Sequence, residues 1–599
     1  GARTEAAVVP IETVGAWPVF DRDRMLPGDN ITGPAIIKEA TATTVVEPGW
    51  SASVNTLGDL VLTRTTPRAL THAVGTDADP ILLEVFNNLF MHIAEQMGHT
   101  LEKTAYSVNI KERLDFSCAV FDRHGNLVAN APHMPVHLGS MGESVRHMIS
   151  KVGDTLRPGD VYMLNDPYNG GTHLPDVTVI TPVFDDDDGT LLFFTASRGH
   201  HADIGGLTPG SMPPMSKHLE EEGVLIDCFH LLDQGTFRLE AMEALLTGAR
   251  YPVRNLQQTV ADLQAQVAAN EKGVAELKHM VTQFTLPVVE AYMGHVQRNA
   301  EEQVRRVIDR LEDGQFHWPL DNGAAIKVSV TVDKARRQAK VDFTGTSGQQ
   351  PDNFNAPMPV TRAAVMYVFR TLVDEPIPMN EGCLAPIDIT IPDGSMLAPD
   401  WPAAVVAGNV EVSQCVTDAL YGALGVMAGA QGTMNNLTFG NATYQYYETI
   451  CGGSAAGKHA NGQGFAGTGP IHTNMTNSRL TDPEVLEFRY PVLVEHFAAR
   501  TGSGGAGAFR GGDGAVRRLR FLEAMTVSIL SNHRTVAPFG IAGGGDGAVG
   551  RTTIIRQDGS QQELAAADST DVKPGDCVLV ETPGGGGYGT IRAARNDNI

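Results

Sequence analysis

Alternating apolar and polar positions mark two neighbouring strands in the first half of the chain. Residues 177–184 and 191–195 are apolar and β-branched, and an acidic, glycine-containing turn separates them. Two such runs around a short turn are typical of a β-hairpin. Polar clusters at 165–176 and 197–203 flank the hairpin. The sequence therefore predicts that both clusters lie at neighbouring strand ends.

Apolar residues at helical spacing indicate two longer helical regions. In 81–97 they recur every three or four positions, and Asp79 and Pro80 supply an N-cap and a first-turn proline. A second helical pattern runs from 255 to 313 and is interrupted at Pro287. Both regions are expected to support the strands.

The remaining chain alternates short strands, glycine turns and shorter helices, so the predicted fold class is α+β. We expect a multidomain protein with mixed and antiparallel β layers, a helical segment and a glycine-rich β C-terminal region. The predicted parts are a small β module at 1–65, a linker at 66–78, an α+β domain with the polar clusters at 79–250, a helical segment at 251–315, a second α+β region at 316–502 and the glycine-rich region at 503–599.

Length and charge narrow the class of protein. A chain of 599 residues is too long for one core, because single domains usually hold about 100–200 residues. A net charge of −24 argues against nucleic acid as a partner, since phosphate contacts need Lys and Arg. No apolar run reaches the ~18 residues of a membrane span. The N-terminus lacks both a signal-peptide pattern and an initiator Met, so we expect a processed or trimmed chain.

Cysteine usage points to a reducing compartment. The six cysteines are scattered and contain no C-x-x-C pair, which is typical of neither a zinc-thiolate site nor a disulfide framework. The sequence therefore predicts a cytoplasmic protein. They are Cys118, Cys228, Cys383, Cys415, Cys451 and Cys577.

The polar clusters have the composition of a metal site. His173 and Asp176 lie three residues apart on a loop that Gly170, Gly171 and Pro175 constrain. An isolated H-x-x-D more often caps a turn, but two polar clusters joined by one hairpin favour a metal. Either His200 or His201 can supply a further ligand, and Asp115 or His137 can complete four. Mixed imidazole and carboxylate ligation suits zinc, manganese or iron.

Several loops carry further polar or flexible residues. His133 and His137 are placed on a proline-containing loop, and the segments 408–411 and 472–477 are expected to be loops that serve turns or contact substrate. The Pro-, Met- and Gly-rich stretch 205–223 is expected to be a wall or lid over a site. Residues 452–458 spell G-x-x-x-x-G-K, but His459 replaces the Ser or Thr of a phosphate loop, so we reject that function.

Two motifs make a family resemblance specific. NDPYNGGTHLPD at 165–176 and RGHHADIGG at 198–206 closely resemble the signature of the hydantoinase B/oxoprolinase family, which includes subunits of acetone and acetophenone carboxylases. The resemblance continues through 353–357 and 474–487 and covers roughly 79–590. It implies that Asp115 is a metal ligand. The resulting candidates for catalysis and metal binding are Asp115, His173, Asp176 and His200, with His137, Asp166, His201 and Asp203 as supporting or alternative residues.

The resemblance implies an enzyme subunit. In such systems an A-type partner uses ATP to phosphorylate a cyclic amide, such as a hydantoin or an oxoproline-like lactam, and the B-type chain completes hydrolysis at a divalent metal. An alternative is ATP-dependent ketone carboxylation, because the carboxylases share these motifs. A non-catalytic scaffold with a structural metal is a third possibility, which the exposed His/Asp loops make less favourable.

The N-terminal module resembles a different chain. Residues 33–37 and 42–50 are similar to the C-terminal end of hydantoinase A. This resemblance implies a piece of the A-type chain fused in front of the B-type chain. It also predicts a hetero-oligomer with an ATP-binding A-type partner, in which residues 1–65 contact that partner.

Overall fold

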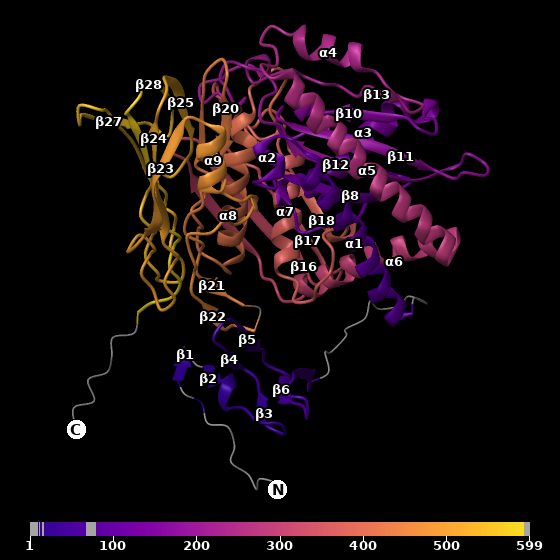
Figure 1. Ribbon diagram of the computed structural model, residues 1–599, viewed down its shortest axis with the longest axis vertical. Helices are drawn as coiled ribbons and strands as arrows, with labels where there is room; N and C mark the ends of the chain where they lie inside the picture. Colours follow the sequence, from indigo (N-terminus) through magenta and orange to yellow (C-terminus); the bar gives the residue numbers. More distant parts are fainter. Residues whose placement is uncertain (1–9, 11, 15–16, 67–78, 460, 592–599) are drawn as a thin grey trace. The chain divides into compact units, whose positions relative to one another are not determined.

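The computed structural model describes residues 10, 12–14, 17–66, 79–459 and 461–591. The chain divides into two compact units, Gly1–His72 and Ala73–Ile599 (Figure 1). Both helices and antiparallel sheets are present, which confirms the predicted α+β class. Of the predicted linker at 66–78, only Thr66 belongs to the described residues.

The first unit is made of short strands around a small core. Two sheets have the orders β1-β2-β4-β5 and β3-β6-β7. The core contains Phe20, Ile37 and Val54 among its buried side chains. The strands are β1 Glu12–Val14, β2 Trp17–Asp21, β3 Asn30–Thr32, β4 Ala35–Lys38, β5 Thr43–Val46, β6 Trp50–Val54 and β7 Leu60–Arg64.

In the second unit, a seven-stranded antiparallel sheet carries the polar clusters, with the order β14-β13-β10-β11-β12-β8-β9 (Figure 1). The strands are β8 Phe116–Asp122, β9 Leu127–Asn130, β10 Val161–Leu164, β11 Asp176–Phe184, β12 Leu191–His200, β13 Phe229–Asp233 and β14 Thr236–Phe237. Phe121 packs with helix α3, Pro135–Val152, whereas Val120 packs with α1, Pro80–Thr104. Because adjacent residues of β8 face opposite sides, helices cover both faces of the sheet.

The predicted hairpin is confirmed as β11 and β12. Its register pairs Asp176 with His200 at the open end of the hairpin. Directly opposed residues of an antiparallel pair have Cβ atoms about 4.5–5.5 Å apart. The fold thus places a residue of the first polar cluster beside one of the second.

The two predicted helical regions are also present. α1 begins after Asp79, whose carboxylate accepts the N–H of Ile81 at 2.8 Å. The second region forms α5, Leu256–Phe284, and α6, Leu286–Ile308, with Pro287 in the first turn of α6. α5 runs along the sheet beside β11 and β12 (Figure 1). The smaller helices nearby are α2 Val108–Lys111 and α4 Leu239–Thr247.

His137 lies on helix α3, which corrects the loop predicted there. Pro135 occupies the first turn of this helix. A proline at that position removes only an N–H that the helix leaves unpaired, so it begins the helix instead of preventing it. Met141 and Val145 then form part of the buried stripe that packs on the sheet.

A second group of helices and strands surrounds the largest core. Helices α7 and α8 pack against each other and against a sheet of order β15-β16-β17-β18. Its strands and helices are β15 Gly314–Pro319, β16 Ala325–Asp333, β17 Gln338–Asp342, β18 Ile387–Thr390, α7 Met358–Thr371 and α8 Ser413–Leu424. The segment Gly408–Val412 is a π-helix leading into α8, which corrects the loop predicted at 408–411. Single π-helical turns are frequent at functional sites.

The C-terminal region is rich in strands, as predicted. Two sheets have the orders β20-β19-β25-β28 and β23-β24-β29-β26-β27. The elements are β19 Asn436–Gly440, β20 Gln445–Glu448, β21 Gly457–Lys458, β22 Gly464–Phe465, α9 Pro483–Arg489, β23 Val492–Arg500, β24 Gly514–Phe521, β25 Met525–Leu530, β26 Arg551–Ile555, β27 Gln561–Leu564, β28 Ala567–Val572 and β29 Cys577–Glu581.

The glycine runs pack backbone against backbone beside these sheets. Gly585 donates its N–H to Gly512 O at 2.9 Å, and Gly505 donates to Gly585 O at 2.8 Å. A Cβ added at Gly585 would lie 1.9 Å from Ser454 O. Glycine is therefore required here because neighbouring backbones occupy the space of a side chain.

Among the described residues, the helices are all too short or too polar to cross a membrane.

Candidate metal centre

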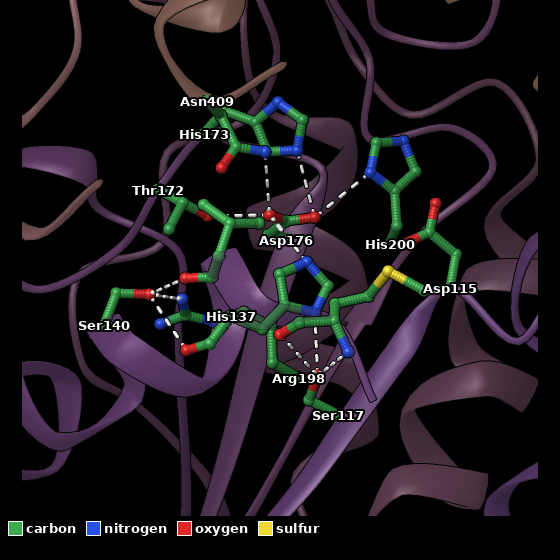
Figure 2. A network of polar contacts seen from close by, with 12 residues as sticks. Asp115, Ser117, His137, Ser140, Thr172, His173, Asp176, Arg198, His200 and Asn409 are labelled. Atoms are coloured by element: carbon green, nitrogen blue, oxygen red, sulfur yellow. Dashed lines mark hydrogen bonds and ion pairs between the residues drawn. The ribbon is translucent and has the colours of Figure 1, made fainter. Parts of the chain in front are cut away.

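The carboxylate of Asp176 is the centre of a buried polar cluster (Figure 2). Its Oδ1 lies 3.0 Å from His173 Nε2 and 3.0 Å from His200 Nδ1. Asp176 and His173 are fully buried, and His200 is 2% exposed. Three of the predicted site residues therefore converge on one oxygen atom.

The second oxygen of Asp176 is occupied by three donors. Oδ2 lies 2.7 Å from Thr172 Oγ1, 3.1 Å from His137 Nε2 and 3.3 Å from Asn409 Nδ2. These donors approach from the loop before β11, from α3 and from the π-helix. They fix the plane of the carboxylate and leave Oδ1 facing the two imidazoles.

Ser117 on β8 orients His137. Its Oγ lies 3.3 Å from His137 Nδ1 and accepts the N–H of Met134 at 3.0 Å. Since His137 faces an acceptor-only carboxylate through Nε2, the proton belongs on that nitrogen and Nδ1 accepts from Ser117. His137 thus supports Asp176, in agreement with the supporting function predicted for it.

Arg198 joins the segments that carry these residues (Figure 2). Its fully buried guanidinium donates to Ser140 Oγ at 2.6 Å on α3 and to Thr178 Oγ1 at 2.7 Å on β11. It also donates to Gly170 O at 3.1 Å on the loop that leads to His173. Burial lowers the pKa of Arg198 to about 10, while the charge of Asp176 favours its protonated form. Arg198 therefore remains a cation at neutral pH.

The electrostatics of the cluster favour an ionised Asp176. Burial alone would raise the pKa of this carboxyl, but His137 and His173 outweigh burial and hold the pKa well below its usual range. Burial lowers the pKa of His200, although Asp176 and Asp115 oppose that change. The site thus combines an anionic carboxylate with a neutral imidazole, which are the protonation states of metal ligands.

Asp115 faces the same small cavity but is not part of the tightest group. The cavity has a volume of about 20 Å³ and is lined by Asp115, His137, Asp176, His200 and Asn409, among others. Asp115 Oδ2 lies 3.7 Å from the buried guanidinium of Arg113. Its backbone oxygen accepts the N–H of His200 at 3.0 Å.

The other three predicted supporting residues have partners elsewhere, and none of them lines this cavity. Asp166 accepts the N–H of Tyr168 at 2.9 Å and so caps a short helical turn. His201 Nε2 lies 2.9 Å from Gln266 Oε1 on α5, and Asp203 pairs with Arg254 at 2.7 Å. Of the two adjacent histidines, His200 is the one that faces Asp176.

The donor atoms fit a divalent cation. One ligand atom from each of His173, Asp176 and His200 lies within 4.8 Å of the others. Neighbouring ligands of a tetrahedral zinc ion, each about 2.0–2.1 Å from the metal, lie about 3.3 Å apart, close to the two 3.0 Å contacts at Oδ1. Neither ring nitrogen of His173 has a hydrogen-bond partner, and the same holds for His200 Nε2. Buried nitrogens without partners point to an ion.

Several residues of the site have no local signal in the sequence. Tyr447 stacks on His200 with ring centroids 4.5 Å apart, and Thr449 and Thr476 line the cavity. Asn409 enters from the π-helix. Thr172 alone belongs to a recognisable motif, in which only its neighbours are predicted as ligands.

Two other sequence expectations have clear outcomes. No residue of the stretch 205–223 lines the cavity; its residues His218 to Gly223 border a separate groove with Trp401. The segment Gly452–Lys458 ends in the two-residue strand β21 and leads to no helix among the described residues, which agrees with its rejection as a phosphate loop.

Comparison with known proteins gives a consistent picture. The profile of the hydantoinase B/oxoprolinase family matches residues 79–591. The chain is 45% identical to 5-oxoprolinase 1 of Arabidopsis thaliana over 96% of its own length, but it spans only 47% of that relative. The B-type component of a putative D-/L-hydantoinase from a Pseudomonas species is 30% identical over 85% of this chain and 90% of its own.

A solved structure has the same fold. The ATP-dependent caprolactamase of Pseudomonas jessenii superimposes with a TM-score of 0.76 at 26% identity. The superposition covers 86% of this chain and 92% of that protein. The shared part is large enough to include both the sheet and the glycine-rich region.

Proposed function

This chain belongs to the hydantoinase B/oxoprolinase family, and on that premise we propose that it completes the hydrolysis of a cyclic amide in an ATP-dependent enzyme. The observation that carries the proposal is the convergence of His173 and His200 on one oxygen of a buried aspartate. The relative named 5-oxoprolinase and the caprolactamase both support a lactam as the substrate class.

We assign His173, Asp176 and His200 as ligands of a divalent cation, with Asp115 as the further ligand across the cavity. Zinc, manganese or iron suits these donors, because calcium prefers oxygen ligands alone. Such a cation would polarise the oxygen of the activated amide. Loss of any of these four side chains is therefore expected to impair catalysis.

The chain's own groups hold the reacting atoms in place. Thr172, His137 and Asn409 fix the orientation of Asp176, and Tyr447 fixes the ring of His200 by stacking. Apolar walls exclude bulk water from the cavity, which strengthens electrostatic interactions inside it. The site is thus built to bind and orient a carbonyl group.

ATP is assigned to an A-type partner, as the family resemblance implies. That partner would phosphorylate the amide oxygen, and the present chain would hydrolyse the activated amide in a hetero-oligomer. Unstrained amides resist hydrolysis, so this division of labour gives the metal site a better electrophile. We propose a cytoplasmic location as well, because all six cysteines are unpaired thiols.

The N-terminal unit is assigned to the partner interface. The family profile begins at residue 79, whereas the match to the plant 5-oxoprolinase covers 96% of the chain and so extends into Gly1–His72. This unit exposes Val45, Leu57, Val61 and Leu62 at 39–85% of their surface. Apolar side chains gathered on so small a module are typical of an interaction surface.

Replacing Val61 and Leu62 together by serine is expected to weaken assembly with the A-type partner by at least tenfold in Kd. Both side chains lie on the edge strand β7 and support no core of the unit. Thr63→Ser on the same exposed strand is the matched control. Analytical ultracentrifugation of the mixed chains measures the change. Assembly of the double variant at the wild-type concentration would contradict the interface.

Activity of the assembled complex tests the proposed function. Purified complex is incubated with 5-oxoproline or a hydantoin plus ATP, and in parallel with acetone or acetophenone plus bicarbonate and ATP. We expect ring opening and release of ADP only in the first set. Carboxylation in the second set would select the alternative reaction. A metal-depleted complex that unfolds and never regains activity would favour the scaffold.

A further inference from the structure

The cavity at the metal cluster is too small for the substrate class proposed above. Its volume of about 20 Å³ exceeds the roughly 10–15 Å³ that one water needs. A lactam ring contains at least five heavy atoms and occupies several times that space. Ring binding therefore requires part of the wall to move.

Three buried methionines form much of this wall. Met134, Met434 and Met475 are at most 3% exposed, and they come from three separate segments of the chain. Methionine has three rotatable bonds and no branch, so it changes shape more easily than other apolar side chains. These residues are the most adaptable groups around the cavity.

The rest of the wall is held firmly. Tyr447 stacks on His200, and its hydroxyl donates to Asn436 Oδ1 at 2.9 Å. Val136 and Val410 lie on helical segments, where β-branched side chains strongly favour one rotamer. The sulfur of Met134 accepts the N–H of Asn477 at 3.3 Å. Met434 and Met475 have no such polar contact in the described part of the chain.

We propose that Met434 and Met475 determine which ring sizes the enzyme accepts. Both side chains would turn aside to admit a compact lactam, and their bulk would exclude larger rings. The inference rests on the proposed hydrolysis of a cyclic amide and adds the residues that select it. A five-membered ring requires a smaller displacement than a seven-membered ring, so the wild-type enzyme is expected to prefer the smaller one.

Two lactams of different ring size test this inference in the assembled complex. The substrates are 5-oxoproline and its seven-membered homologue, 7-oxoazepane-2-carboxylate, which carry the same carboxylate. The measured quantity is the ratio of kcat/KM for the larger ring to kcat/KM for the smaller ring. Met434→Ala and Met475→Ala are each expected to raise this ratio on the order of tenfold, the lower end of the effect of one methylene in an apolar pocket.

Met163→Ala provides the matched control. Met163 is fully buried on β10, in an apolar cluster that does not line the cavity. It should reduce stability and leave the ratio unchanged. Met434→Val and Met475→Val remove part of the same volume, and they replace any alanine variant that does not fold. Metal content is measured in parallel to confirm that the cluster is intact.

Each outcome has a defined meaning. An unchanged ratio in folded, metal-loaded variants of both methionines would overturn the inference, as would an equal rise in Met163→Ala. Absence of lactam turnover by the wild-type complex would instead overturn the proposed function, because ring selection is measured only among rings that are hydrolysed.

Discussion

Replacing Asp176 by asparagine is expected to remove both the bound metal and turnover. Asparagine keeps the shape of the side chain and can still accept a hydrogen bond from Thr172. It removes the negative charge that two imidazoles face at 3.0 Å. Loss of a residue that only supports a ligand costs about 10–100-fold in metal affinity or activity, so loss of the central ligand should cost more. Elemental analysis and the lactam assay measure both effects.

Two adjacent histidines offer a matched comparison for the same site. His200 and His201 are both almost fully buried, yet His200 contacts Asp176 and His201 contacts Gln266. His200→Ala should therefore lose metal, whereas His201→Ala should keep metal and lose only stability. Full metal occupancy in Asp176→Asn, or equal metal loss in the two histidine variants, would refute the ligand assignment.

Local sequence signals are sufficient for the elements that bring the first ligands together. The hairpin at 177–195 follows from alternating β-branched residues, and its antiparallel register alone sets Asp176 opposite His200. The cap and proline at Asp79 and Pro80 locate the start of α1. Chemistry close in sequence, such as His173 with Asp176, can be paired without any tertiary structure.

The remaining wall of the site depends on contacts between distant segments. Asn409 reaches Asp176 across 233 positions of sequence. Tyr447 reaches His200 from a strand of another sheet. Neither residue has a spacing that marks it, because tertiary packing and not local periodicity brings it to the cavity. The sequence pattern also places His137 on a loop, because a proline can break a helix, whereas Pro135 starts α3.

The sequence predicts the glycine-rich region as tight turns between strands, but the region also packs backbone directly against backbone. This feature has a large expected effect on stability. Gly585→Ala is expected to destabilise the protein by about 3 kcal/mol or more, at or beyond the upper end of typical overpacking costs. The new Cβ would lie 1.9 Å from Ser454 O and 2.5 Å from Ser454 C.

The neighbouring atoms at Gly585 have little freedom to move away. Ser454 O already accepts the N–H of Gly512 at 2.9 Å, and Gly512 O accepts that of Gly585 at 2.9 Å. Relief of the clash would break this ladder of backbone hydrogen bonds. The apparent melting temperature in a thermal scan should therefore fall markedly, even though Gly585 lies outside the metal cluster.

Gly545 supplies the control within the same region. A Cβ added there would meet its nearest neighbour, Ala506 O, at 3.4 Å, which is ordinary contact. Neither glycine has a positive φ, so alanine is compatible with the backbone conformation at both positions. The two substitutions thus differ only in the space around the new methyl group. Gly545→Ala should melt near the wild-type temperature, and a similar melting temperature for Gly585→Ala would show that the glycine segments are loosely packed.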